Sequence, residues 1–177
     1  MKLTQWRSVA HGTSVAPLDW FGSNRRESFM VTTVGTESTF EKLVQNLIIL
    51  EHDAIAAYES TIQKLEDPTS KAKISEFKAD HDSHVAELTR MAGTLGVSAP
   101  QEGDMKEYLT TGKIALASMV GDKTILKAMS TNEIETKMAY DQASKNTVAT
   151  PEARTFFQKA LADETRHKAW MDTAAES

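Results

Sequence analysis

The chain has 177 residues, a net charge of −5 and no cysteine. Its length fits one domain with a core that needs no disulfides. The absence of cysteine excludes disulfides, thiolate catalysis, iron–sulfur clusters and zinc–cysteine sites, so any metal must be held by His, Asp and Glu. The composition, 40% hydrophobic and 25% charged, is that of an ordinary globular protein. No apolar run approaches the roughly 18–20 residues of a membrane-spanning helix.

The charge is unevenly distributed along the chain. Residues 1–36 hold four basic and two acidic side chains, whereas the remainder holds 16 basic against 23 acidic ones. An acidic body argues against nucleic acid as a partner and suits the binding of cations. We therefore expect neither nucleic acid nor a membrane as partner.

Residues 1–36 also differ in pattern, because they contain three glycines, one proline and two tryptophans without any periodicity. We predict an irregular N-terminal segment, followed by one domain over residues 37–177. Arg25-Arg26 resembles the start of a twin-arginine export signal, but the residues after it are too few and too polar for an apolar region. We expect a cytoplasmic protein, with Met30 as an alternative start of the chain.

Glycine and proline divide the remainder into helices. No glycine lies in residues 36–92 or 122–177, and each stretch is interrupted by a single proline, Pro68 and Pro151. Proline is tolerated in the first turn of a helix, and the residues before these two prolines, an Asp and a Thr, are good N-caps. Together with apolar residues at spacings of three and four, this pattern predicts four helices, at 38–65, 68–94, 122–146 and 151–174.

A long connection, residues 96–121, separates the second predicted helix from the third. We expect it to contain a short helix near 104–119. The loops inside each pair of helices are short, so each pair should form an antiparallel hairpin. The sequence therefore predicts an all-α four-helix bundle, made of two hairpins joined by one long crossover.

Matching polar motifs occur in the two predicted hairpins. Glu51 precedes Tyr58 by seven residues, as Glu133 precedes Tyr140, at an offset of 82 residues. Residues seven apart are two helical turns apart, so each acid shares a helix face with its tyrosine.

A second pair of motifs follows at nearly the same offset. Ala-Asp-His-Asp-Ser-His-Val-Ala in the second helix matches Ala-Asp-Glu-Thr-Arg-His-Lys-Ala in the fourth, 83 residues later. Buried carboxylates repel one another and are costly to desolvate unless a cation neutralises them. We therefore interpret six residues as candidate metal ligands: Glu51, His81, His84, Glu133, Glu164 and His167. Two tyrosines are candidate hydrogen-bonding partners of those ligands: Tyr58 and Tyr140.

Glu on each of two helices, with Glu-x-x-His on each of the other two, is typical of dinuclear carboxylate centres in bundles. On the four motifs just named, residues 37–175 resemble the ferritin-like superfamily, most closely its little-characterised bacterial branch of ferritin-like domain proteins. The resemblance covers about four fifths of the chain. It implies two iron ions, with manganese or zinc as alternatives on ligand softness, and O2 or peroxide as a reactant.

One position departs from the pattern of that family. Position 81, where the family usually has a bridging Glu, is His, so Glu164 remains as the obvious bridging carboxylate. This departure leaves open an asymmetric two-metal site, a single-metal site or a degenerate one. Asp53, Asp80 and Glu135 are nearby acids that could compensate, although they lie off the ligand-bearing faces.

Two functional hypotheses remain. The first is a metal-binding ferritin-like protein that oxidises or handles iron, or removes peroxide, as part of a stress response. The alternative is a metal-free or vestigial bundle with a structural or interaction role. Because the outer positions of the first two helices are charged, we expect a monomer or homodimer rather than a cage. The sequence does not decide whether the chain is an enzyme.

Overall fold

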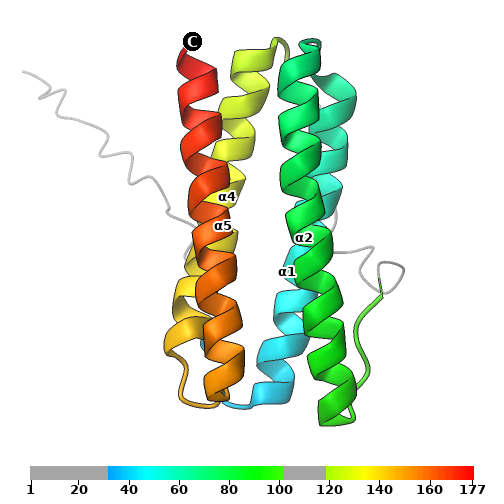
Figure 1. Ribbon diagram of the computed structural model, residues 1–177, viewed down its shortest axis with the longest axis vertical. Coiled ribbons are helices and arrows are strands. Elements are labelled where there is room, and N and C mark those ends of the chain that lie inside the picture. The colour runs from blue at the N-terminus through cyan, green and yellow to red at the C-terminus, as the bar shows by residue number, and fades with distance from the viewer. Residues whose placement is uncertain (1–31, 102–118) are drawn as a thin grey trace, which may run out of the picture.

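The computed structural model describes residues 32–101 and 119–177. Within these ranges it contains four long helices and no strand, as Figure 1 shows. The helices are α1 (Phe40–Lys64), α2 (Pro68–Leu95), α4 (Asp122–Lys145) and α5 (Pro151–Glu176). All of their ends lie within two residues of the predicted ones, so the all-α four-helix prediction is confirmed. None of these four helices has an apolar stretch long enough to cross a membrane.

The helices begin where the sequence places their caps. The Asp67 carboxylate accepts a hydrogen bond from the backbone N–H of Ser70 at 2.7 Å, and the Thr150 hydroxyl accepts one from Ala153 N–H at 3.2 Å. Both prolines stand in the first turn, where a missing N–H leaves no hydrogen bond unmade. Thr39 caps α1 in the same way. These caps define the starts of α1, α2 and α5, whereas α4 begins after Gly121 without a side-chain cap.

The bundle consists of two antiparallel hairpins, α1–α2 and α4–α5, with α1 packed on α4 and α2 beside α5. In Figure 1, α2 ends at the bottom of the bundle whereas α4 begins at its top. The chain therefore leaves α2 at one end of the bundle and enters α4 at the other, which agrees with the predicted crossover. The short helix expected near 104–119 falls almost entirely outside the described residues.

Two apolar clusters occupy the two ends of the bundle. The cluster at one end includes Leu43, Leu47, Leu88 and Phe157, and the cluster at the other includes Ile74, Phe77, Leu126, Met129 and Met171. Each cluster takes residues from all four helices, and the named side chains are fully buried or nearly so. The apolar core is therefore divided, and polar side chains fill the middle layer.

Residues 32–39 run beside α4 before α1 begins. The side-chain amide of Asn146 donates hydrogen bonds to the carbonyl oxygens of Gly35 at 3.0 Å and Glu37 at 2.9 Å. Gly35 has a φ of 101°, and a Cβ at this position would lie only 2.4 Å from the carbonyl oxygen of Ala139. The close approach of this segment to α4 therefore requires glycine at 35. Residues 1–31 of the predicted irregular segment lie outside the described residues.

We predict opposite effects on stability for two glycine substitutions. Gly35→Ala should lower the free energy of unfolding by about 1–3 kcal/mol, because the new methyl group meets α4 and the backbone is left-handed. Gly93→Ala should raise it by roughly 0.5–1 kcal/mol, because Gly93 is helical and a Cβ there meets nothing within 4 Å. Denaturant unfolding measures both. Equal midpoints for the two variants would show that the segment at 32–39 is not docked on α4.

Candidate metal centre

The six candidate ligands come together in the middle layer of the bundle. They come from all four helices, and each residue is at most 1% exposed. The members are Glu51 on α1, His81 and His84 on α2, Glu133 on α4, and Glu164 and His167 on α5. A buried layer of three carboxylates and three imidazoles thus separates the two apolar clusters.

These side chains form two overlapping groups that could each hold a metal ion. The first group, here called the Glu51 position, consists of Glu51, His81, His84 and Glu164. The second group, the Glu133 position, consists of His81, Glu133, Glu164 and His167. In each group, the possible ligand atoms lie within 4.8 Å of one another. His81 and Glu164 belong to both positions, so the two positions are adjacent.

Both carboxylate oxygens of Glu51 are hydrogen-bonded. Oε2 lies 2.7 Å from Nδ1 of His81, and Oε1 lies 3.2 Å from Nδ1 of His84. The hydroxyl of Tyr140 donates a further hydrogen bond to Oε1. Since an ionised carboxylate can only accept, Nδ1 of His81 carries the proton, and its Nε2 is left to bind a metal ion or a second proton.

The atoms around Glu133 are arranged differently. The hydroxyl of Tyr58 donates to Oε1 of Glu133 at 2.7 Å, but Oε2 has no hydrogen-bond partner among the described residues. The same holds, in this part of the chain, for Nε2 of His81, Nδ1 of His167 and both oxygens of Glu164. Nδ1 of His167 lies 3.6 Å from Glu133 and 3.8 Å from Glu164. Five buried polar atoms thus lie close together without a hydrogen-bond partner in the described part of the chain.

Two aspartates orient the outer histidines. Nε2 of His167 lies 3.0 Å from the carboxylate of Asp80, and Nε2 of His84 lies 3.4 Å from that of Asp163. The guanidinium of Arg166 donates to both aspartates, at 2.8 and 2.9 Å. With Asp80 accepting from Nε2, the lone pair of His167 lies on Nδ1 and points into the centre. From the sequence, Asp80 is interpreted only as a nearby acid that could compensate for His81, and no signal there points to Asp163 or Arg166.

The tyrosine partners cross between the hairpins. Tyr58 and Glu51 share α1, yet Tyr58 binds Glu133 on α4; Tyr140 on α4 binds Glu51 in return. Burial raises the pKa of both tyrosines well above the usual value, with nearby carboxylate charge adding to the effect. Both therefore stay protonated as donors and hold Glu51 and Glu133 in place. Helix periodicity shows which residues share a face, but not this exchange.

Burial and neighbouring charge shift the pKa values of the three glutamates in different directions. Burial alone would raise the pKa of Glu51, but the charge and hydrogen bond of His81 outweigh it and hold the pKa well below the usual range. Burial likewise opposes ionisation of Glu133, whose pKa is nevertheless lowered by His167 and His81. The pKa of Glu164 is raised well above its usual value by burial and by the charges of Glu133 and Glu51. Glu164 is thus the carboxylate that lacks a compensating cation.

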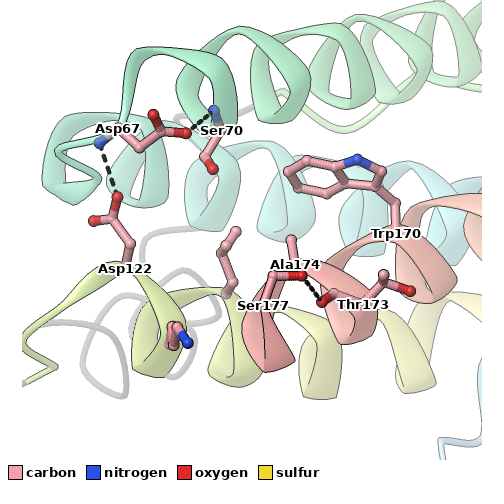
Figure 2. Close-up of a pocket in the computed structure, with 9 residues that line it drawn as sticks. Asp67, Ser70, Asp122, Trp170, Thr173, Ala174 and Ser177 are labelled. Carbon is pink, nitrogen blue, oxygen red and sulfur yellow. Dashed lines mark hydrogen bonds between the residues drawn. The ribbon is translucent and has the colours of Figure 1, made fainter.

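Neither of the two groups includes Asp53 or Glu135, the other acids considered from the sequence. A surface pocket of about 460 Å³ lies at the end of the bundle where α4 begins and α5 ends. Figure 2 shows the residues that line it. One of its lining groups is engaged in structure, because the carboxylate of Asp122 accepts from the backbone N–H groups of Glu66 and Asp67 at 2.9 and 2.8 Å. These two hydrogen bonds join the start of α4 to the turn between α1 and α2.

Fold and site together define an all-α four-helix bundle with a buried Glu/His centre that can hold a metal ion. The chain belongs to the family described as a domain of unknown function (DUF2383), whose model matches residues 39–146. That range includes α1, α2 and α4 but ends before α5, and therefore before Glu164 and His167. No curated protein and no solved structure matches the chain. The family description assigns no function.

We predict that the metal-free protein loses stability as the pH rises above 6.5. The pKa of His81, although lowered by burial, is raised overall from 6.5 by Glu51, so its contribution is complete below pH 6.5 and is lost as the pH rises through the folded-state pKa. Glu164 acts in the same direction, because its raised pKa favours the unfolded state once unfolded glutamate ionises. Thermal unfolding with a chelator present measures this fall in melting temperature.

Glu164→Gln should make the decrease in melting temperature with rising pH smaller, because an amide has no proton to lose. Glu135→Gln, on the exposed face of α4, should leave the slope as it is in the unchanged protein. A melting temperature that stays constant or rises above pH 6.5 would contradict the assignment of raised pKa values to His81 and Glu164.

Proposed function

We propose that this chain is a metal-binding protein of the ferritin-like kind, holding two iron ions between its four helices. Manganese and zinc are the alternatives that three carboxylates and three imidazoles also suit. The fold supports the proposal, because two hairpins joined by a crossover along the bundle are the arrangement of ferritin-like bundles. The single observation that carries it is a set of buried atoms around Glu164 that have no hydrogen-bond partner among residues 32–101 and 119–177.

Those atoms fit a divalent cation on chemical grounds. A buried carboxylate oxygen or imidazole nitrogen without a partner costs free energy, and carboxylates without a cation repel one another. Both oxygens of Glu164 are in this state, at 3.6 Å from Nδ1 of His84 and at 3.7 Å from Nε2 of His81. Glu164 therefore has one oxygen toward each position, as a bridging carboxylate requires.

The protein's own groups have defined tasks in this proposal. Glu51, His84, Glu133 and His167 would hold the ions together with Glu164 and His81, and Asp80 and Asp163 orient the imidazole rings of His167 and His84. The apolar clusters at both ends keep water from the centre. A bound iron ion would supply redox chemistry and open coordination positions for O2 or peroxide. We propose a role in iron oxidation, iron handling or peroxide removal under stress.

We also propose a monomer or homodimer in the cytoplasm. Among the described residues, Val120 is the only large hydrophobic side chain that is exposed. A shell of many subunits would need apolar contact surface on each chain. The exposed faces of these helices carry ion pairs instead, such as Lys73 with Glu76 at 2.9 Å.

The test is removal of the bridging carboxylate. Glu164→Ala should release at least one equivalent of metal from protein purified without chelator, measured by elemental analysis. Its melting temperature in metal-replete buffer should fall, because the ion that it held stabilises the folded state. Tyr140→Phe should cost less, roughly 10–100-fold in metal affinity, since Tyr140 only supports Glu51.

Glu135→Ala provides the control and should change neither metal content nor melting temperature. In a metal-free bundle, removal of the buried acid would instead relieve repulsion and stabilise the protein. A Glu164→Ala variant that melts higher, from a parent that contained no metal, would favour the structural or interaction role and end the metal proposal.

A further inference from the structure

The two positions in the centre differ in how far their ligand atoms are already occupied. We propose that the Glu133 position is the primary metal site and that the Glu51 position takes a second ion more weakly. This inference rests on the proposed function and deepens it. It concerns the order in which the positions fill, which neither the family nor the repeat in the sequence states.

The Glu51 position is closed by its own hydrogen bonds. Glu51 accepts from Nδ1 of His81 at 2.7 Å, from Nδ1 of His84 at 3.2 Å and from the hydroxyl of Tyr140. An ion entering between these residues must break the contacts of Glu51 with both imidazoles, because it needs the same oxygens and nitrogens. Among the described residues, one atom without a hydrogen-bond partner belongs to this position alone. It is Oε1 of Glu164, which lies 3.6 Å from Nδ1 of His84.

In the Glu133 position, by contrast, each residue has a ligand atom that makes no hydrogen bond to a described residue. Nδ1 of His167, Nε2 of His81 and Oε2 of Glu133 are buried and have no hydrogen-bond partner in the described part of the chain. Oε2 of Glu164 is in the same state, 3.7 Å from His81 and 3.8 Å from His167. Each of the four residues of this position thus directs one free atom at the others. An ion binding here gains four ligands and breaks none of the hydrogen bonds seen among them.

His81 is the residue that makes the two positions unequal. A neutral imidazole has one nitrogen with a free lone pair, and Nδ1 uses its proton to bind Glu51. Nε2 is therefore the ligand atom, and it faces Glu164 and Glu133, at 3.7 and 4.0 Å. A carboxylate at position 81 could serve both positions with two oxygens, whereas this histidine serves the Glu133 position.

The experiment is an anaerobic titration of the full chain with Fe2+, followed by calorimetry. The unchanged protein should bind one equivalent tightly and a second more weakly. Glu133→Gln and Glu51→Gln form a matched pair, since each replaces a buried mid-helix glutamate by an isosteric amide. We expect Glu133→Gln to weaken the tight phase by more than the roughly 10–100-fold that loss of an outer partner costs. Glu51→Gln should leave the tight phase within a few-fold and remove the weak one.

A second matched pair guards against a variant that fails to fold. His167→Gln should behave as Glu133→Gln, and His84→Gln as Glu51→Gln, with helix content checked by circular dichroism. Glu135→Gln, on the exposed face of α4, should change neither phase. If only one equivalent is measurable, the same ordering of variants is expected for it.

Two outcomes would overturn the inference, and they can be told apart. Equal weakening by Glu51→Gln and Glu133→Gln, or loss of the tight phase in Glu51→Gln, would show that the positions are equivalent or reversed, while metal binding itself stands. No binding of Fe2+, Mn2+ or Zn2+ by the unchanged protein would end the proposed function and the inference together.

Discussion

Three carboxylates and three imidazoles share one buried layer, and the rest of the bundle is arranged around this constraint. Charged groups in such a layer are costly to desolvate unless they are paired and hydrogen-bonded. Glu51 meets the requirement through two histidines and a tyrosine. Glu164 does not, because neither of its oxygens has a hydrogen-bond partner among the described residues. Burial and the charges of Glu133 and Glu51 raise the pKa of its carboxyl well above the usual value. A cation is the group that would satisfy the whole layer.

The fold serves this layer in two ways. The apolar clusters above and below it supply the burial that stabilises the helices, so the polar layer need not contribute stability of its own. Because α2 and α4 run in the same direction, α1 is antiparallel to α4 and α2 is antiparallel to α5. The two halves of the internal repeat meet at one height because each polar motif lies near the middle of its helix. Each hairpin then supplies one Glu and one pair of residues spaced by three. The crossed tyrosines bind the two hairpins to each other at that height.

Much of the fold could be predicted from the sequence because it depends on local signals. Gly-free stretches, capped prolines and spacings of three and four determine where α1, α2, α4 and α5 begin and end. The meeting of six polar residues could also be anticipated, since each lies mid-helix on a face shared with apolar residues. These inferences require only the period of a helix and the length of the loops.

What the sequence could not show depends on side-chain direction across helices. The role of Asp163 and Arg166 arises because α5 presents them to His84 and Asp80 on α2. The direction of each imidazole nitrogen, and therefore the difference between the two positions, depends on which carboxylate lies within hydrogen-bonding distance. The repeat in the sequence suggests equal halves, with His81 as the only sign of inequality. Helical periodicity contains no information on such contacts.

The most direct test is an anomalous-scattering measurement on crystals grown without chelator, recorded at the absorption edges of iron, manganese and zinc. We expect an anomalous peak between α2, α4 and α5, bounded by Glu133, Glu164 and His167, at the edge of one of these metals. Its edge would identify the metal directly. An ordered centre with no anomalous peak at any of the three edges, in protein supplied with all three metals, would contradict the metal-centre assignment.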